Sequence, residues 1–369
     1  MAAQQVLVLV AAGGTGGHLF PAEALAAALE RRAIAVHLAT DRRATRYRSM
    51  FAEETVHFIT SATLRGRNPI ALMRTAGALG LGFAEAWVLI GRLKPAAVIG
   101  FGGYPTIPPV LAAAWRGVPS LIHDANAVIG RANRLLAPHV AAIATTFPGI
   151  FRGNPNLAAK TTLTGNPVRP TVVAAAATPY PALDAPLRLL VFGGSQGAQV
   201  MADVVPDAIR LTDRRLRARL AVVQQAREED LGRVRKAYAG LSVPAEIAPF
   251  FADLPARMAA SHLIVARSGA STVAELAAIG RPAILVPLPH ALDQDQFANA
   301  GILASVGGAV RLAQDQFTPQ QLAAEIAALA ATPQRLAQMA AAAKSLGRLD
   351  AADRLADLVL KVARTAANE

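Results

Sequence analysis

Ala11-Ala12-Gly13-Gly14-Thr15-Gly16-Gly17-His18-Leu19 is a glycine-rich stretch that lies between an apolar run and an Ala/Leu-rich segment. The apolar run, residues 6–10, is β-prone and has the length of one buried strand. Pro21 suits the first turn of a helix, which the Ala/Leu-rich residues 24–29 continue. The stretch therefore predicts a strand, a glycine loop and a helix. In such a unit, backbone N–H groups and the helix N-terminus can hold an anion.

A dinucleotide-binding fingerprint is the first alternative for this loop, but the spacing does not fit. Leu19 stands where the pattern G-x-G-x-x-G requires its third glycine. His18 is the one residue of the loop that can move a proton near neutral pH. The loop alone leaves two interpretations of His18 open: a proton-transfer group, or a histidine that caps the helix or lies exposed.

The composition predicts a two-domain chain without cysteine chemistry. Its 369 residues are enough for two domains of ordinary size, and it contains no cysteine for disulfides, thiolate metal sites or nucleophiles. We expect a cytoplasmic protein, because the first apolar run has no basic segment before it and ends in glycine. The longest candidate for a membrane span, residues 76–90, is short and carries Glu85.

The net charge of +12 is concentrated in the first part of the chain. Residues 1–165 hold 16 Lys and Arg against 7 Asp and Glu. Such an excess favours an anionic partner, either phosphate ligands or anionic lipid. Nucleic acid is disfavoured, because no recognised binding module is present and aromatic residues make up only 5% of the chain.

Apolar runs and helical segments alternate along the chain, which is typical of parallel sheets covered by helices. In the first half we expect strands at 6–10, 34–39, 56–59, 97–100, 119–122 and 140–144, and helices at 21–32, 43–53, 70–93 and 106–116. Residues 164–186, with five prolines and four consecutive alanines, predict a domain boundary. The pattern then restarts with strands expected at 187–192, 219–223, 245–249, 262–265, 282–286 and 309–312.

Residues 318–366 are predicted to be helical, with a break near Gly347. We therefore expect two doubly wound domains that face each other across a cleft lined by the carboxyl ends of their strands.

Polar clusters follow several of the expected strands. Gly100-Phe101-Gly102-Gly103-Tyr104 is a second backbone-rich loop, which is either a phosphate-binding loop or a plain turn. His123-Asp124-Ala125-Asn126 follows the fifth strand. In the second domain, the spacing of Thr272 and Glu275 leaves two alternatives open. The pair is a capping box, or the Glu275 carboxylate accepts hydrogen bonds from sugar hydroxyls. Residues 290–299 are rich in polar side chains, which favours a ligand-lining loop.

Six motifs in chain order resemble the MurG family of N-acetylglucosaminyltransferases. They are Gly-Gly-Thr-Gly-Gly-His at 13–18, Gly-Phe-Gly-Gly-Tyr at 100–104, Gly-Asn-Pro-Val-Arg at 165–169, Gly-Gly-Ser-Gln-Gly at 193–197, Arg-Ser-Gly-Ala-x-Thr-x-x-Glu at 267–275 and Gln-x-x-Asn-Ala at 296–300. The resemblance implies the two-domain GT-B fold. It also implies inverting transfer of GlcNAc from UDP-GlcNAc to the C4 hydroxyl of MurNAc in lipid I, which yields lipid II.

The resemblance divides the chain into an acceptor domain, residues 1–166, and a UDP-GlcNAc-binding domain, residues 167–349, with helix 350–366 packing back on the first. It implies that His18 is the catalytic base. The positions implied to bind the acceptor are Gly13, Gly14, Gly102, Gly103, Tyr104 and Asn126. Those implied to bind the donor are Thr15, Gly16, Gly17, Asn126, Arg169, Ser195, Gln196, Gly197, Arg267, Ser268, Thr272, Glu275, Gln296 and Asn299.

Three residues, in two motifs, depart from the family pattern. The family commonly has His-Glu-Gln-Asn where this chain has His123-Asp124-Ala125-Asn126, and Asp295 stands where glutamine or histidine usually precedes Gln296. No carboxylate pair matches the metal-binding Asp-x-Asp of the other large glycosyltransferase fold, so we expect no essential metal or cofactor.

A polyprenyl-diphosphate acceptor implies a peripheral enzyme on the cytoplasmic face of the inner membrane, with cell-wall synthesis and division proteins as further partners. We expect an apolar patch of Leu79, Leu81, Phe83, Trp87 and Leu89, flanked by Arg65, Arg67, Arg74, Arg92 and Lys94, to dock on anionic lipid. The alternative is that these apolar residues face the core. The alternatives for the whole chain are another GT-B glycosyltransferase, a UDP-GlcNAc 2-epimerase and a non-catalytic cell-wall scaffold.

Overall fold

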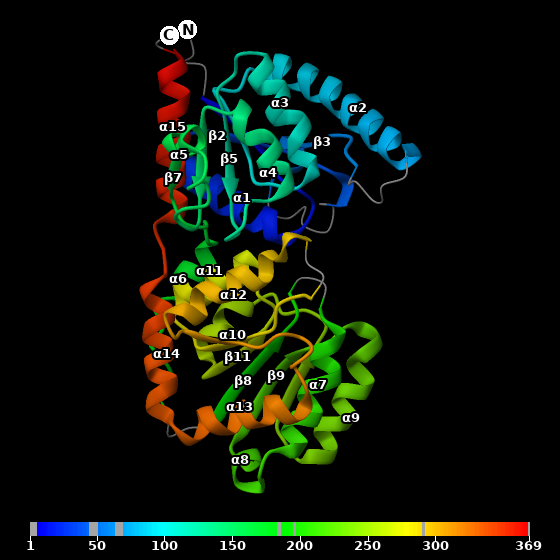
Figure 1. The fold of residues 1–369 in the computed structure, drawn as a ribbon, viewed down its shortest axis with the longest axis vertical. Coiled ribbons are helices and arrows are strands. Elements are labelled where there is room, and N and C mark those ends of the chain that lie inside the picture. Colours follow the sequence, from blue (N-terminus) through cyan, green and yellow to red (C-terminus); the bar gives the residue numbers. More distant parts are fainter. Residues whose placement is uncertain are drawn as a thin grey trace. The chain divides into compact units, whose positions relative to one another are not determined.

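The chain forms two compact units, which Figure 1 shows in a computed structural model that describes residues 6–43, 51–62, 69–182, 186–194, 197–289 and 292–367. Unit 1 comprises residues 1–169 and 349–369, and unit 2 comprises residues 170–348. The chain therefore enters unit 2 once and returns to unit 1 with its last helix, α15 (Ala351–Ala367).

Unit 1 is built on a parallel sheet of seven strands in the order β3-β2-β1-β4-β5-β6-β7. The strands are β1 (Leu7–Ala11), β2 (Ala35–Thr40), β3 (Val56–Phe58), β4 (Ala97–Gly100), β5 (Ser120–Asp124), β6 (Ala142–Thr145) and β7 (Thr161–Leu163). Each of the six strands expected from the apolar runs is present. β7 was missed because its three residues are partly or fully exposed and two of them are threonines, so it leaves no apolar run.

Helices cover both faces of this sheet, because successive side chains of a strand point to opposite faces. α1 (Gly16–Glu30) and α15 pack on the face that carries Val8 and Val10. α2 (Pro69–Leu93), α3 (Ile107–Trp115) and α4 (Arg131–Leu136) pack on the face that carries Leu9 and Ala11. The remaining short elements of the described part of unit 1 are η2 (Glu53–Thr55), η3 (Tyr104–Thr106), η4 (Ala137–His139) and α5 (Pro155–Ala159).

One helix begins earlier than expected. α1 begins at Gly16 and runs through Pro21, so His18 lies in the first helical turn and the expected start at residue 21 is wrong. Thr15 has extended backbone and is the N-cap, but its side chain makes no capping hydrogen bond. The helix expected at 43–53 lies largely outside the described residues.

Unit 2 is built on a parallel sheet of six strands in the order β10-β9-β8-β11-β12-β13. The strands are β8 (Leu187–Phe192), β9 (Leu220–Gln225), β10 (Ala245–Ala248), β11 (Leu263–Ala266), β12 (Ala283–Leu285) and β13 (Ala309–Arg311). All six strands expected in the second half are present. With both sheets parallel and helix-covered, the expected α/β class is confirmed.

The helices of unit 2 pack around its sheet, and three of them share one large core with it. α7 (Gln199–Leu211), α9 (Leu231–Leu241) and α13 (Pro319–Ala331) share a core with β8, β9 and β11. The other elements are α8 (Arg214–Ala218), η5 (Glu228–Asp230), α10 (Leu254–Ala260), α11 (Ala270–Ile279), η6 (Leu292–Gln294), α12 (Asp295–Ser305) and α14 (Pro333–Ser345). The helical stretch expected at 318–366 breaks not only near Gly347 but also at Thr332-Pro333, where proline ends α13 and begins α14.

The proline-rich boundary segment is packed onto unit 2. It contains α6 (Pro170–Ala175), which contacts α10 and α11. The buried Arg281 donates hydrogen bonds to the carbonyl oxygens of Thr178 and Pro179 at 3.2 and 2.9 Å. A buried guanidinium that is satisfied by carbonyls holds the segment in place, because losing those acceptors would leave its donors unpaired.

Candidate active site

Two glycine loops close around the ring of His18 at the carboxyl edge of the first sheet. Gly102 and Gly103 both have positive φ, +92° and +80°. A Cβ on Gly103 would lie 3.4 Å from His18 Nε2 and 3.5 Å from the Cα of Gly13, and one on Gly102 would lie 3.3 Å from His18 Cε1. The loops after β1 and β4, expected separately from the sequence, therefore form one site around the imidazole, and the positive φ of Gly102 and Gly103 favours glycine there.

The hydrogen bond of His18 determines which ring nitrogen is available for chemistry. Nδ1 lies 2.9 Å from the carbonyl oxygen of Phe101. A carbonyl oxygen only accepts, so Nδ1 carries the proton and donates it to Phe101. Nε2 therefore keeps its lone pair, which is the arrangement that a general base requires.

The surroundings of His18 favour its neutral form. Burial of the imidazole lowers its pKa below the usual 6.5, and the nearby positive charge of Arg43 lowers it further, although the hydrogen bond to Phe101 opposes both. The neutral, proton-accepting form is therefore the main form at pH 7.

The third cluster expected from the sequence is a buried support for the loop that carries Asn126. Asp124 is 1% exposed, and its carboxylate accepts hydrogen bonds from the backbone N–H groups of Asn126 and Gly130 at 3.1 and 2.9 Å. Asn133 donates to Asp124 Oδ2 at 3.0 Å. His123 is fully buried, and its Nε2–H donates to the carbonyl of Gly165 at 3.0 Å. His123 and Asp124 thus shape the site from within, and Asn126 is the half-exposed residue of the three.

Arg169, the last residue of unit 1 before the boundary, lies against α1. Its Cζ is 4.1 Å from the centre of the Phe20 ring, a cation–π contact one helical turn from the glycine loop. Burial raises the pKa of the nearby Glu23 carboxyl, and the charge of Arg169 counteracts part of that rise. The sequence motifs identified Arg169, but not its contact with Phe20, which requires the tertiary fold.

In unit 2, the glycine loop after β8 makes a tight turn. Gly194 and Gly197 have positive φ, and the N–H of Gly193 donates to Gln225 Oε1 at 3.1 Å. A Cβ on Gly193 would lie 2.2 Å from the backbone nitrogen of Ala198, so glycine is required there. Ser195 and Gln196, two of the expected donor-binding residues, lie outside the described residues.

The motifs at 267–275 and 296–300 come together into one cluster. The Oγ of the fully buried Ser268 donates to the carbonyl of Gln296 at 2.8 Å, and Asn299 Nδ2 donates to the carbonyl of Ser268 at 3.3 Å. The Oε1 of Gln296 accepts the backbone N–H of Leu288 at 3.1 Å, and its amide Nε2–H₂ has no acceptor among the described residues. Arg267 donates to the carbonyls of Val286 and Pro287 and to Gln314, and so joins three loops.

The capping-box interpretation of Thr272 and Glu275 is wrong. The N-cap of α11 is Gly269, and no side chain caps this helix. Thr272 therefore lies inside the first turn and Glu275 one turn later, where its side chain is 5% exposed. The other interpretation of Glu275, as an acceptor for sugar hydroxyls, stays a prediction.

The residues before α12 adopt an unusual backbone conformation. Asp293 and Gln294 have φ of +63° and +52°, a backbone conformation that residues other than glycine adopt at an energetic cost. Asp295 begins α12, and its Oδ1 accepts the backbone N–H of Gln296 at 2.8 Å. Burial raises the pKa of the Asp295 carboxyl, with a smaller contribution from the charge of Asp293. His290, at the start of the expected ligand-lining loop, lies outside the described residues.

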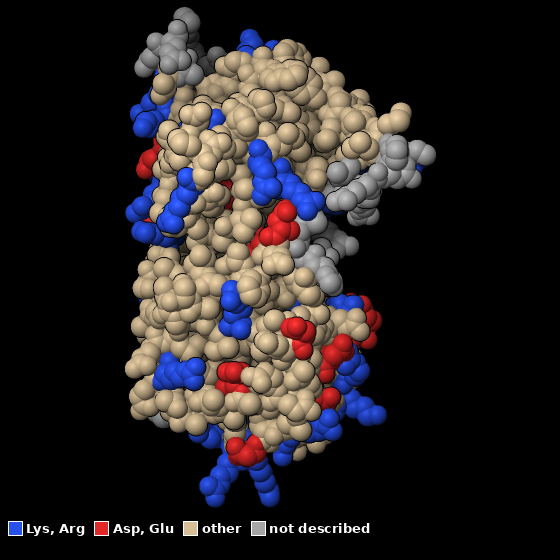
Figure 2. Space-filling model, in the orientation of Figure 1, with Lys and Arg blue, Asp and Glu red and all other residues tan. Residues whose placement is uncertain are grey.

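The outer side of α2 carries large apolar side chains. Exposed on it are Leu72, Met73, Leu81, Trp87 and Val88, and Trp115 of α3 is also exposed. Figure 2 shows few charged side chains where α2 lies. Of the apolar residues expected to contact lipid, Leu81 and Trp87 are exposed, Leu79 and Phe83 are half-buried, and Leu89 is buried in the core at 7% exposure, so its assignment is wrong. Arg74, Arg92 and Lys94 are exposed, while Arg65 and Arg67 lie outside the described residues.

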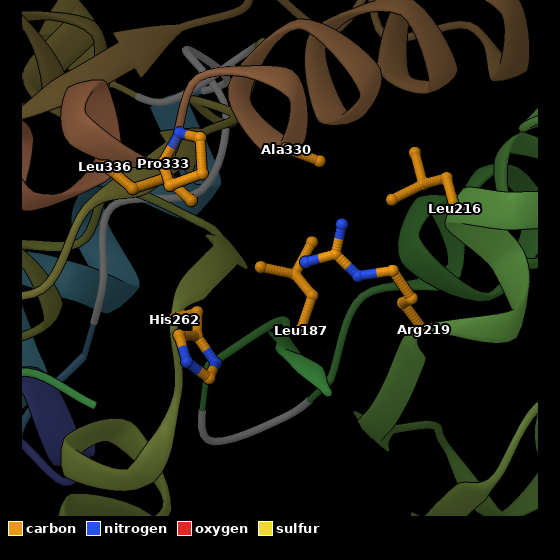
Figure 3. Close-up of a pocket in the computed structure, with 7 residues that line it drawn as sticks. All are labelled: Leu187, Leu216, Arg219, His262, Ala330, Pro333 and Leu336. Atoms are coloured by element: carbon orange, nitrogen blue, oxygen red, sulfur yellow. The ribbon is translucent and has the colours of Figure 1, made fainter. Parts of the chain in front are cut away.

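A small cavity of about 10 Å³ lies at the amino ends of the strands of the second sheet, whereas the glycine loop of unit 2 follows a carboxyl end (Figure 3). Leu187, Arg219 and His262, which line it, stand at or just before the starts of β8, β9 and β11. Its volume suits a single water molecule, so this cavity is no substrate site. Within the described ranges, no three His, Cys, Asp or Glu side chains are grouped in a way that could hold a metal ion.

Comparisons with known proteins agree with this arrangement. The family model of the glycosyltransferase family 28 N-terminal domain matches residues 8–145, and the model of the C-terminal domain of the same family matches residues 188–355. A protein of Rhodopseudomonas palustris (strain BisB18), named UDP-N-acetylglucosamine--N-acetylmuramyl-(pentapeptide) pyrophosphoryl-undecaprenol N-acetylglucosamine transferase, is 64% identical over 97% of this chain and 96% of its own.

Solved structures confirm the expected GT-B fold class. MurG of Acinetobacter baumannii matches with a TM-score of 0.78 and 29% identity, over 97% of this chain and 100% of that one. UDP-GlcNAc 2-epimerase from Neisseria meningitidis matches with a TM-score of 0.67 and 16% identity, over 96% of this chain and 100% of that one, a likeness of fold alone. Because such relatives share its sequence along nearly the whole length, and both domain models match, the chain belongs to the MurG family of glycosyltransferases, within glycosyltransferase family 28.

Proposed function

We propose that the protein transfers GlcNAc from UDP-GlcNAc to the C4 hydroxyl of MurNAc in lipid I, with inversion at the anomeric carbon, and so forms lipid II. The observation that carries this proposal is 64% identity over 97% of the chain to a transferase named for that reaction. The site geometry supports it, because a neutral histidine faces two glycine loops at the edge of a parallel sheet.

His18 is the catalytic base of this reaction. An inverting transfer needs one group to take the proton from the attacking hydroxyl while the sugar moves to it. His18 Nε2 keeps its lone pair because Nδ1–H is held by the Phe101 carbonyl. The glycines at 13, 14, 102 and 103, together with Tyr104 and Asn126, bind the acceptor around this base.

Unit 2 binds the donor. The cluster of Arg267, Ser268, Gln296 and Asn299 presents the amide Nε2–H₂ of Gln296, which has no acceptor among the described residues, and Thr272 and Glu275 lie on α11. In this assignment Glu275 accepts hydrogen bonds from ribose hydroxyls, and Gly197 with its neighbours approaches the diphosphate. We also assign Thr15, Gly16, Gly17, Asn126 and Arg169, all in unit 1, to donor binding.

Transfer is independent of a metal ion in this proposal. The departing UDP carries a diphosphate, whose charge must be stabilised as the glycosidic bond breaks. Backbone N–H groups of glycine loops and helix N-termini supply such stabilisation directly. We expect undiminished transfer in EDTA.

The protein works as a peripheral enzyme on the cytoplasmic face of the inner membrane. By length and composition, residues 71–93 of α2 would suffice to cross a bilayer. However, Glu85 on its inner side accepts hydrogen bonds from the N–H and Oγ1 of Thr60 at 2.6 and 2.9 Å, and Gly82 packs closely on the same residue. α2 is thus part of the folded unit, and we propose that its exposed apolar side lies on the lipid surface between cationic side chains.

UDP release from UDP-GlcNAc, measured with and without a lipid I analogue in EDTA, tests the function. Release only when the acceptor is present, accompanied by a disaccharide product, is the expected result. His18→Ala should lower this rate by a factor on the order of 10² to 10⁴, while the exposed His139 serves as the control in His139→Ala.

The same assay separates the rival functions. An epimerase with this fold would consume UDP-GlcNAc without any acceptor, and a scaffold would bind the sugar nucleotide without turnover. Transfer to a different hydroxyl acceptor, but not to lipid I, would indicate another GT-B glycosyltransferase.

A further inference from the structure

The residues that follow β2 lie beside the start of the first glycine loop. β1 and β2 are neighbouring parallel strands in which Ala11 pairs with Ala39. Beyond the paired residues, the Thr40 hydroxyl donates to the carbonyl of Ala12 at 2.8 Å, and the N–H of Ala12 donates to the carbonyl of Ala39 at 3.1 Å. The chain after Thr40 therefore leaves the sheet next to the loop that carries His18.

There, a buried carboxylate holds a guanidinium in a fixed orientation. Asp41 is 8% exposed, and its Oδ1 accepts the backbone N–H of Arg43 at 3.0 Å. Its Oδ2 accepts Nε of Arg43 at 2.7 Å and lies 2.5 Å from Nη2. The Nη1 group has no hydrogen-bond acceptor among the described residues, and 52% of the Arg43 side chain is exposed. Donors of a positioned cation thus remain available to a ligand.

The ordinary role of such a pair is to close a turn. An exposed arginine contributes little stability through one ion pair, however, and burying a carboxylate has a desolvation cost. The pair also acts on the candidate active site, because the charge of Arg43 helps to lower the pKa of His18. A cation in electrostatic range of the base complements the negative charge of a phosphate ligand, to which backbone N–H groups can also donate.

We propose that Arg43 binds phosphate oxygens of the acceptor's diphosphate beside the first glycine loop, and that Asp41 is the positioning residue that orients it. This inference rests on the proposed function, since the acceptor is the polyprenyl diphosphate that the function requires. Neither residue belongs to the six motifs, which is why the sequence did not indicate them.

Steady-state kinetics with a soluble lipid I analogue tests the assignment. Arg43→Gln should raise the KM for the acceptor by about 10-fold or more, because a charge-assisted hydrogen bond is lost. The KM for UDP-GlcNAc should stay unchanged. The acceptor KM of Arg43→Lys should lie between those of the wild type and Arg43→Gln, because lysine keeps the charge but not the planar fork. Asp41→Asn should also raise the acceptor KM.

Arg31→Gln is the matched control. Arg31 follows the other end of α1 and pairs with Asp353 at the surface, so the substitution removes the same charge from the same unit away from the loop. Its acceptor KM should equal that of the wild type. In addition, Arg43→Gln should move the acid limb of the pH profile to higher pH, because the base is then more easily protonated, a shift that a purely structural role would not produce.

Three results would overturn the inference. The first is an acceptor KM and a pH profile that Arg43→Gln leaves unchanged. The second is a rise in the KM for UDP-GlcNAc instead, which would assign the cation to the donor's phosphates. The third is equal losses in all parameters together with a lower melting temperature, which would make the pair structural. A wild-type enzyme that fails to transfer would instead contradict the proposed function.

Discussion

At the scale of single residues, the tautomer of His18 leads to a pH prediction. The base is active when neutral, and its pKa lies below the usual 6.5 because of burial and the charge of Arg43. Transfer, measured as kcat/KM for the acceptor, should therefore be constant from about pH 7 upward and fall at acid pH, with the midpoint of the fall below 6.5. His18→Ala should remove this acid limb along with most of the rate, and an unchanged limb in that variant would show that another group titrates.

A second residue prediction concerns Gly103, whose φ of +80° and ψ of 157° belong to a region that is open to glycine almost alone. Gly103→Ala strains the backbone and places a Cβ in contact with the His18 ring, 3.4 Å from Nε2, so that relief of the strain moves the loop against the base. We expect a loss of about 1–3 kcal/mol of stability and a kcat lower by 10-fold or more.

Gly117→Ala separates the two effects. Gly117 also has positive φ, +72°, but nothing lies within 4 Å of its Cβ position. This variant should lose comparable stability in urea unfolding while keeping the wild-type kcat. Equal kcat values in the two variants would argue against the close packing of Gly103 on His18.

At the scale of elements, α2 supports a membrane prediction. Met73 and Val88 are 73% and 69% exposed on its outer side. Replacing both with aspartate should weaken sedimentation with anionic vesicles by a factor on the order of 10, because apolar contact is lost and like charges repel. Transfer to a short-chain soluble acceptor should not change.

Leu211→Asp is the control for this experiment. Leu211 is 50% exposed at the end of α7 and belongs to unit 2, whereas α2 belongs to unit 1. Its vesicle binding should match that of the wild type. Undiminished binding of the α2 variant would remove this helix as the docking surface.

At the scale of the whole molecule, the last helix makes unit 1 discontinuous in sequence. Leu355 of α15 is fully buried in the core of unit 1, and Arg32 of the α1 end pairs with Asp357 at 2.8 Å. Leu355→Ala should cost about 2–5 kcal/mol of the unfolding free energy of unit 1, because it leaves a cavity in that core. The half-exposed Leu349 gives the control Leu349→Ala, which should cost less than about 1 kcal/mol.

Urea unfolding with and without UDP-GlcNAc measures this effect. The ligand should stabilise unit 2, so the transition that it leaves unmoved reports unit 1. Leu355→Ala should shift that transition alone. A shift confined to the ligand-sensitive transition would contradict the assignment of α15 to unit 1.

Much of the fold followed from local patterns. Every strand with an apolar run was predicted, because consecutive apolar residues are a signal that the local sequence carries by itself. β7 was not, since two of the three residues of Thr161–Leu163 are threonines and leave no apolar run. The start of α1 was misplaced because glycines at 16 and 17 and a proline at 21 disfavour a helix locally, while packing of α1 on the sheet overrides that preference.

The sequence by itself determined the two-sheet architecture, the family and the motif residues, because strand periodicity and glycine spacing are local properties of the chain. Only the tertiary structure decided which partners those residues have. It set the proton of His18 through a carbonyl that lies 83 residues away and excluded the capping box by moving the N-cap of α11 to Gly269. It also brought Arg43 within electrostatic range of His18, because neighbouring parallel strands end at one edge of the sheet, whatever their distance in sequence.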